Sequence, residues 1–315
     1  SSPSSRPSAS RKSSSDSPSS EFGIQNSELR AATTFIVTVT EALSAASAKL
    51  PKREGIPDPR REASWLLAAA WGVEEITLRL HPERKLPADV ERRFGDWIER
   101  RAAGVPSHHL TGRCSFWGRE FEVGPAVLVP RPETELIVQV ALELPLNAEA
   151  RVIDVGTGSG CIAVSLAAER ESWRVAAVDL QPTALAVALR NIALHDVSIP
   201  CFLGDLTSAL SPPWDLVVAN LPYIPAADLD YLPLEVRHDP VSALDGGSDG
   251  LDLVRRLLSD LSRVLRLCGG AILELGENQA DVVTDLAAAC GLAVARRLTD
   301  ADGCDRVVVL QAFPF

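Results

Sequence analysis

The sequence predicts an α/β protein, in which a doubly wound domain with a mostly parallel sheet follows a small helical domain. From residue 151 onward, short apolar runs alternate with helical patterns. Such alternation is typical of a parallel sheet with helices on both faces. A glycine-rich segment, VIDVGTGSGC (152–161), joins the first of these runs to a helical pattern. Before them, residues 30–105 carry apolar residues at helical spacing.

The first residues of the chain differ in composition from the rest. Residues 1–20 are almost all serine, proline and charged residues. Such a segment cannot bury apolar surface, so we expect residues 1–29 to be a disordered tail, either a linker added for expression or a natural segment.

A helical domain is expected at residues 30–112. Helical spacing is seen in TTFIVTVTEALSAASAKL (33–50), DPRREASWLLAAAWGV (58–73) and PADVERRFGDWIERRAAG (87–104). The third helix is charged on one side, as a surface helix would be. We therefore expect its arginines to be exposed to solvent; they are Arg92, Arg93, Arg100 and Arg101.

A β-hairpin and a linker helix are expected at residues 113–150, because CSFWGREFEVGPAVLVP (114–130) alternates around glycines. Residues 151–315 then form the expected catalytic domain. Strands are predicted at 151–156, 173–180, 199–206, 214–220 and 269–276, and helices at 160–170 and 181–194. The last segment, 292–313, is predicted to form two strands joined by a turn, which is unusual for dinucleotide-binding folds.

Composition excludes several classes of function. The 315 residues carry a net charge of −11, which argues against direct binding of nucleic acid. No apolar run approaches the roughly 20 residues that cross a bilayer. The six cysteines include no C-x-x-C pair and the five histidines form no metal-spaced set. We expect a cytoplasmic monomer with reduced thiols, no metal and no membrane contact.

The glycine-rich segment predicts a loop that binds a cofactor. Gly156, Gly158 and Gly160 lie between a strand and a helix, where their backbone can approach a ligand closely. The next predicted strand ends at Asp179. A carboxylate at that position can accept both hydroxyl groups of a ribose.

Two classes of cofactor compete for this loop. A dinucleotide site would normally read G-x-G-x-x-G, with a pyrophosphate at the helix N-terminus. Here the loop reads G-x-G-x-G, and Asp154 lies two residues before its first glycine. That carboxylate suits an ammonium group, which favours S-adenosylmethionine, and Asp205 can meet the amino group of adenine. The candidate cofactor-binding residues are Asp154, Gly156, Thr157, Gly158, Ser159, Gly160, Asp179, Leu180, Asp205, Leu206 and Asn220.

The fourth predicted strand ends in an unusual turn, DLVVANLPYIP (215–225). Asn220 could simply open a turn. Beside a methyl donor, however, its side-chain oxygen and the carbonyl of Leu221 could accept the two N–H groups of a planar amine. Pro222 would stiffen the turn and Tyr223 would lie against the planar group. With the cofactor motifs upstream, we favour the second interpretation and take these four residues as the candidate catalytic set.

The sequence resembles the HemK/PrmC family of protein-glutamine methyltransferases from about residue 30 to 315. The resemblance is carried by VLVPRPETELIV (127–138), VIDVGTGSGCIAVSLA (152–167), AVDLQPTALAVALRN (177–191), RHDPVSALDGGSDGLD (237–252), LELGENQA (273–280) and DADGCDRVVVL (300–310). It implies a Rossmann-like, class I S-adenosylmethionine-dependent methyltransferase fold with a seven-stranded sheet, a helical N-terminal substrate-recognition domain and a hairpin linker. It also implies methylation of the glutamine side-chain amide in the Gly-Gly-Gln tip of class I peptide-chain release factors.

One departure from the family pattern keeps alternatives open. The family motif is Asn-Pro-Pro-Tyr, whereas Asn220 is followed here by Leu-Pro-Tyr, a form similar to that of rRNA adenine dimethyltransferases. An adenine-amino methyltransferase acting on rRNA or DNA is therefore the alternative, and a non-catalytic cofactor-binding subunit is a third.

The segment PRPETE (130–135) either opens a helix or borders the active-site mouth, and the sequence does not decide between these.

Overall fold

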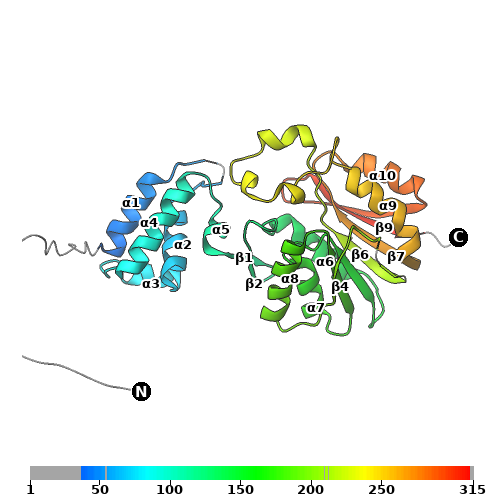
Figure 1. Ribbon diagram of the computed structural model, residues 1–315, viewed down its shortest axis with the longest axis horizontal. Helices are drawn as coiled ribbons and strands as arrows, with labels where there is room; N and C mark the ends of the chain where they lie inside the picture. Colours follow the sequence, from blue (N-terminus) through cyan, green and yellow to red (C-terminus); the bar gives the residue numbers. More distant parts are fainter. Residues whose placement is uncertain (1–36, 54, 209, 212, 313–315) are drawn as a thin grey trace, which may run out of the picture. The chain divides into compact units, whose positions relative to one another are not determined.

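The computed structural model describes residues 37–312 except 54, 209 and 212 (Figure 1). The tail expected at residues 1–29 lies outside the described residues. So does the beginning of the first expected helix.

The N-terminal part of the described chain is helical, as expected. Its helices are α1 (Val39–Lys49), α2 (Pro59–Trp71), α3 (Glu75–Leu80), α4 (Ala88–Ala102) and α5 (Ser107–Thr111). Thr38 and Glu41 form a capping box at the start of α1. Gly72, with φ of 70°, ends α2 in the left-handed conformation that favours glycine. Leu66, Phe94 and other apolar side chains of α1, α2 and α4 form the core between these helices.

The N-terminus of α2 offers a test of local stability. Asp58 Oδ1 accepts hydrogen bonds from the backbone amides of Arg60 (3.0 Å) and Arg61 (3.2 Å). We expect Asp58→Ala to lower the free energy of unfolding by about 1 kcal/mol, because these amides lose their acceptor. Asp58→Asn keeps an acceptor and should be nearly as stable as the parent. Thermal unfolding of both variants measures the effect; equal loss in both would contradict the cap.

The expectation of an exposed arginine face on α4 is wrong for one of its four arginines. Arg101 is only 1% exposed. Its guanidinium donates to Glu62 (2.6 Å), to Glu235 (2.8 Å) and to the carbonyl of Gly55 (2.6 Å). Because a buried charge must be paired, these carboxylates account for its position. The contact with Glu235 ties the helical part to a loop of the catalytic part.

A two-stranded hairpin follows the helices, as the alternation around glycines predicted. Strands β1 (Arg113–Phe116) and β2 (Arg119–Glu122) pair in antiparallel register. A 3-10 turn, η1 (Pro132–Thr134), then leads into α6 (Glu135–Glu143), which is the expected linker helix.

The catalytic part contains a seven-stranded sheet in the order β5-β4-β3-β6-β7-β9-β8. Its strands are β3 (Arg151–Val155), β4 (Arg174–Asp179), β5 (Cys201–Leu203), β6 (Trp214–Ala219), β7 (Leu265–Glu274), β8 (Leu292–Thr299) and β9 (Asp305–Ala312). The first five are parallel, and β9 pairs antiparallel with both β7 and β8. The Rossmann-like sheet with its C-terminal antiparallel hairpin is therefore confirmed.

Helices cover both faces of this sheet (Figure 1). One face packs against α6, α7 (Cys161–Glu169) and α8 (Pro182–Leu194). The other packs against α9 (Asp252–Val264) and α10 (Ala280–Ala289). Alternate residues of a strand point to opposite faces, so Val152 lies in the first core whereas Ile153 lies in the second. The carboxyl ends of β3, β4, β5, β6 and β7 meet at one edge, where open α/β sheets bind ligands.

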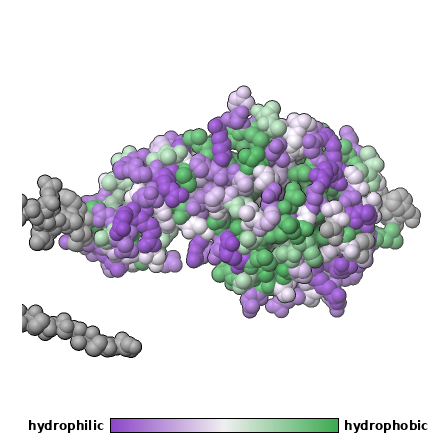
Figure 2. Space-filling model, viewed as in Figure 1, coloured by the Kyte–Doolittle hydropathy of each residue, from purple (hydrophilic) through white to green (hydrophobic). Residues whose placement is uncertain are grey.

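Exposed apolar residues are unevenly distributed on the catalytic part. Figure 2 shows green residues gathered over the area where Figure 1 draws α7 and α8. Leu180, Phe202 and Leu203 are among the exposed large apolar side chains, at 58%, 43% and 59%. Two of them lie on the short edge strand β5, and Leu180 borders the site described below.

The described residues offer neither a membrane-spanning helix nor a metal-binding cluster. Within residues 37–312, apart from the three gaps, no helix is both long and apolar enough to span a bilayer. The same residues contain no cluster of three or more histidine, cysteine or acidic side chains that could hold a metal ion. All six cysteines are free thiols.

Candidate active site

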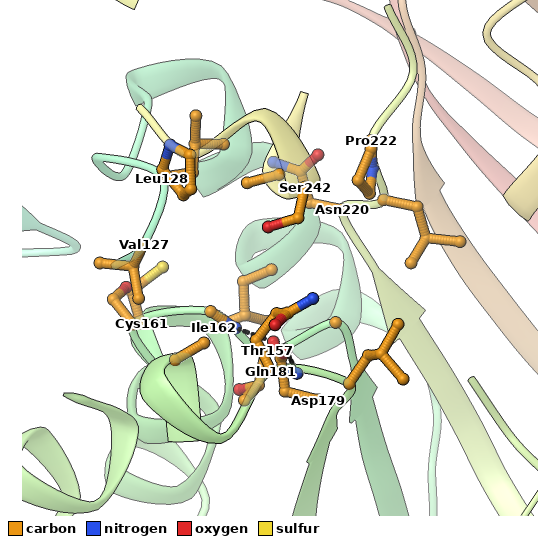
Figure 3. Close-up of a pocket in the computed structure, with 18 of the residues that line it drawn as sticks. Val127, Leu128, Thr157, Cys161, Ile162, Asp179, Gln181, Asn220, Pro222 and Ser242 are labelled. Carbon is orange, nitrogen blue, oxygen red and sulfur yellow. Dashed lines mark hydrogen bonds between the residues drawn. The ribbon is translucent and has the colours of Figure 1, made fainter. Parts of the chain in front are cut away.

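A cavity lies at the carboxyl edge of the parallel strands (Figure 3). The glycine loop after β3, the residues after β4 and β5, and the turn after β6 contribute to its wall. The segment between the hairpin and η1 closes another side with Val127 and Leu128. Figure 3 shows Asp179 and Asn220 on different sides of this cavity. We refer to it as the cofactor cavity.

The glycine loop has the conformation that its sequence predicts. Gly156, Gly158 and Gly160 have φ of 75°, 56° and 81°, which side chains rarely adopt. A β-carbon on Gly160 would lie 3.2 Å from that of Ala188, so this glycine permits close packing of the loop on α8. A β-carbon on Gly158 would meet no atom within 4 Å. Because Gly158 lines the cofactor cavity, that open space is where a ligand can approach the backbone.

Asp179 ends β4 and lines the cofactor cavity. One of its carboxylate oxygens accepts a hydrogen bond from the backbone amide of Gly158 (2.9 Å), and the other accepts one from that of Gln181 (2.8 Å). These bonds fix the carboxylate beside the glycine loop. Each oxygen retains a further acceptor site, so the group can bind a pair of hydroxyls.

Asp154 occupies a different place from the other candidate residues. It is fully buried, and it is not among the residues that line the cofactor cavity. Its Oδ2 accepts hydrogen bonds from the hydroxyl of Thr157 (2.6 Å) and the amide of Ala163 (3.3 Å). Burial raises the pKa of Asp154 to about 7. The geometry makes it a support beneath the loop, and its contact with an ammonium group stays a prediction.

The residues after β5 form the far end of the cofactor cavity. Asp205 and Leu206 both line it, together with Leu180 after β4. Asp205 Oδ2 accepts a hydrogen bond from Arg256 (2.6 Å), so one of its oxygens is already used. Leu206 has φ of 50°, an uncommon backbone conformation for leucine. The apolar side chains and the remaining carboxylate oxygen suit a flat ring that carries an amino group.

Asn220 follows β6 and faces the cofactor cavity. Its Nδ2 donates a hydrogen bond to Thr134 Oγ1 (3.0 Å). Among the described residues, no donor is bonded to Asn220 Oδ1 or to the carbonyl oxygen of Leu221. The side chain of Leu221 is buried, and its Cδ2 lies 3.1 Å from where a β-carbon of Gly156 would be. Both acceptors of the predicted clamp are therefore unused by the described protein atoms.

A second cavity adjoins the first at Asn220 and Leu221, which line both. Tyr223 lines this second cavity and not the first, and burial raises the pKa of its phenol to about 12. Glu133, Glu274 and Arg306 also line it. We refer to it as the substrate cavity, because the acceptors of the turn lie between it and the cofactor cavity.

Sequence reasoning left several of the site's residues undecided or missed them. Arg131 lines both cavities and Glu133 the second, which places part of the PRPETE segment at the site. Glu135 instead accepts a hydrogen bond from the amide of Trp117 (2.7 Å) at the start of α6. The missed residues come from four separate segments and include Val127, Leu128, Thr134, Gln181, Ser242 and Glu274. All six lie in stretches that carry the family resemblance.

Two family models match the chain. The PrmC N-terminal domain matches residues 41–112, and the methyltransferase small domain matches residues 133–232. The first covers the described helices α1 to α5, and the second covers the glycine loop and the Asn220 turn.

Curated relatives cover most of the chain. The release factor glutamine methyltransferase of Cereibacter sphaeroides is 41% identical over 85% of this chain and 96% of its own. That of Moorella thermoacetica is 42% identical over 81% of this chain and 91% of its own. That of Koribacter versatilis is 39% identical over 73% of this chain and 84% of its own.

A solved structure shares the fold. The catalytic domain of hMettl16, in complex with the MAT2A 3'UTR hairpin 6, superposes with a TM-score of 0.52 at 17% identity. The match covers 70% of this chain and 82% of that one. At this identity the likeness concerns the fold alone.

Proposed function

The chain belongs to the family of release factor glutamine methyltransferases, and we propose that it transfers a methyl group from S-adenosylmethionine to a glutamine of a release factor. The acceptor that we propose is the side-chain amide nitrogen in the Gly-Gly-Gln tip of class I release factors. The observation that carries this proposal is the pair of unused acceptors, Asn220 Oδ1 and the Leu221 carbonyl, at the border of two cavities.

The residues of the cofactor cavity fit S-adenosylmethionine. Asp179 offers two fixed carboxylate oxygens to the ribose hydroxyls, and Gly158 leaves the space that a ligand needs beside the loop. Leu180 and Leu206 supply apolar surface for the adenine, while Asp205 retains an oxygen for its amino group. We propose that Asp154 acts mainly by holding Thr157 and the start of α7.

S-adenosylmethionine supplies a methyl group on a sulfonium, whose departure as a neutral thioether needs no acid. The chain must instead position a poor nucleophile, because the lone pair of an amide nitrogen is delocalised. We propose that Asn220 Oδ1 accepts one N–H of the glutamine amide and the Leu221 carbonyl accepts the other. The two acceptors then aim the nitrogen at the methyl group.

The same acceptors favour the charge that develops during transfer. Bound S-adenosylmethionine would supply the methyl carbon to the nitrogen, and the electron pair of its carbon–sulfur bond would leave with the sulfur. The nitrogen becomes positive until it loses a proton to solvent. Preorganised carbonyl oxygens stabilise that positive charge without reorganising. Tyr223, in the substrate cavity, offers its ring to the planar amide.

Substrate recognition is assigned to the helical part and to the loop that it contacts. Arg101 joins α4 to Glu235, and Val236, next along the chain, lines the substrate cavity. This connection can couple recognition of the release factor to the placement of its tip. Action in the cytoplasm belongs to the same proposal, because that is where release factors act on the ribosome.

A comparison of two substrates, each offered separately, tests the proposed function. The protein is incubated with methyl-labelled S-adenosylmethionine and either a class I release factor or an unmodified rRNA. We expect label in the release factor only, and none when the tip glutamine is replaced by alanine. Because an adenine amino group could use the same acceptors, label found only in rRNA would overturn the proposal and would favour the adenine-amino alternative.

A further inference from the structure

Methyl transfer as proposed requires one orientation of the Asn220 side chain. The oxygen and nitrogen of an asparagine amide have nearly the same shape, so the group can be rotated by half a turn without a steric penalty. Only one orientation presents an acceptor to the substrate amide. The other presents an NH2 group, which would repel the substrate's own N–H groups. Something beyond the asparagine must select between them.

Thr134 is the immediate partner but cannot make that selection alone. Its hydroxyl oxygen lies 3.0 Å from Asn220 Nδ2. A hydroxyl is both donor and acceptor, so it could equally donate to the amide oxygen in the rotated orientation. The preference is set by whatever fixes the hydroxyl proton of Thr134. A neighbouring group that can only accept would receive the hydrogen bond of this hydroxyl. The hydroxyl oxygen would then be left to accept a hydrogen bond from Asn220.

Glu274 is the acceptor in the right place. It ends β7, next to β6, and the register pairs Leu273 with Ala219, so Glu274 and Asn220 follow at the same edge of the sheet. Glu274 is 2% exposed and lines the substrate cavity. Burial raises the pKa of Glu274, and the neighbouring Thr134 hydroxyl and Asn220 amide act in the opposite direction by favouring the ionised carboxylate. Its Oε2 has no hydrogen-bond partner within the described part of the chain.

A purely structural ion pair does not explain this buried carboxyl. Arg306 is the cation whose charge lowers the pKa of Glu274, but its guanidinium donates to Asp300 Oδ2 through Nε (3.0 Å) and Nη2 (2.8 Å). Its Nη1 donates to the carbonyl of Leu275 (3.1 Å). Arg306 therefore stabilises the ionised form of Glu274 only by the electrostatic attraction of its charge, without a hydrogen bond. A carboxyl buried without a direct cation is costly, which points to a role in the site.

We propose that Glu274 is a positioning residue that acts through Thr134 to orient the Asn220 amide, with its oxygen toward the substrate nitrogen. This inference rests on the proposed function. Ionised Glu274 is acceptor-only, so it fixes Thr134 as the acceptor for Asn220 Nδ2. Protonated Glu274 carries an O–H group, which can donate to Thr134 or to Asn220 and can occupy the oxygen that the substrate needs.

The inference predicts a pH dependence of turnover. Burial raises the pKa of Glu274 to about 7, with the charge of Glu133 acting in the same direction and that of Arg306 opposing it. Tyr223, which also faces this carboxyl, stays neutral in the same range because its pKa is raised. The acceptor form therefore exists above the pKa. We expect the turnover rate to rise with pH through about 7.

The test compares kcat and the KM for cofactor across this pH range in three proteins. Glu274→Gln, a neutral isostere that carries a donor, mimics the protonated state. We expect it to lower kcat about tenfold above the pKa, the scale of one lost hydrogen bond, and to remove the rise with pH while cofactor KM stays the same. Glu133→Gln removes a charge from the same cavity. It should keep the rise but shift its midpoint to lower pH.

Two variants of Thr134 test whether Glu274 acts through this hydroxyl, without any change at Glu274 itself. Thr134→Ser keeps the hydroxyl and should keep the parent's pH profile, whereas Thr134→Val should lose kcat and the rise together. The inference is overturned if Glu274→Gln matches the parent in kcat at high pH, or if the rise persists in that variant with its midpoint unchanged. The latter result would assign the titration to Asp154, whose pKa is also raised to about 7. Methylation of the release factor by the parent protein would leave the proposed function standing in either case.

Discussion

Asn220→Ala is expected to lower the rate of methyl transfer to release factor about 100- to 1000-fold, the usual effect of losing one preorganised polar group that stabilises the transition state. The affinity for S-adenosylmethionine should change little. In the proposed mechanism Asn220 Oδ1 contacts the substrate amide, which is absent when cofactor binds alone. The only hydrogen bond of the side chain among the described residues goes to Thr134. Single-turnover rates and calorimetric titration of the cofactor separate the two quantities.

A matched control for this variant is Asn147→Ala. Asn147 is exposed and lies before β3, whereas the candidate site lies beyond the ends of the strands. The same chemical change there should leave both rate and affinity at the parent's values. An Asn220→Ala protein that remained folded and methylated release factor at the parent's rate would remove Asn220 from the catalytic set. Loss of cofactor affinity to the same extent as rate would make it a cofactor-binding residue instead.

Asp179→Ala is expected to weaken binding of S-adenosylmethionine by about 1.5–3 kcal/mol, or roughly 10- to 150-fold in Kd. The variant loses the acceptor for the ribose hydroxyls. It also releases the amides of Gly158 and Gln181, which Asp179 holds at 2.9 and 2.8 Å. Calorimetry with cofactor alone measures the loss without reference to any substrate.

The comparison variant is Asp302→Ala, which removes an exposed carboxylate from the turn between β8 and β9. It has the same change in net charge, so it reports any long-range electrostatic effect on cofactor binding. We expect its Kd to equal that of the parent. If both variants weakened binding alike, or if Asp179→Ala bound as tightly as the parent, Asp179 would not be the ribose ligand.

The central strands were predictable because they are buried on both faces. All six residues of β6 are buried, and β3 and β4 are nearly so, which produces the continuous apolar runs seen in the sequence. Helix α9 was not predicted although one side of it packs in the core. Its residues Asp252–Val264 are mostly polar on the other side, and they follow a long stretch of turns with no strand between.

The site was only partly predictable for a related reason. Asp179 and Asn220 each end a strand, so the rule for parallel sheets brings them to one edge. Thr134 contacts Asn220 from a turn 86 residues before it. Glu274 lies 54 residues after Asn220 and ends the neighbouring strand, so the strand order places both at the same edge of the sheet. No spacing in the sequence encodes such a contact.

Asp154 illustrates a limit of the same rule. It belongs to β3, and its side chain lies beneath the glycine loop, where Thr157 and Ala163 bind it. An acid two residues before the first glycine therefore need not face the ligand, because the strand's alternation decides the direction of its side chain. The resemblance of the surrounding motif did not distinguish a ligand from a support.

The most direct test of the central claim is tandem mass spectrometry of the Gly-Gly-Gln peptide from a class I release factor after incubation with this protein and S-adenosylmethionine. The account predicts one added methyl group on the side-chain nitrogen of the tip glutamine. It also predicts that the Asn220→Ala protein, bound to cofactor, leaves this peptide largely unmodified over the time in which the parent protein methylates it. An unmodified tip after incubation with the parent protein, alongside a methylated adenine in rRNA, would contradict the account.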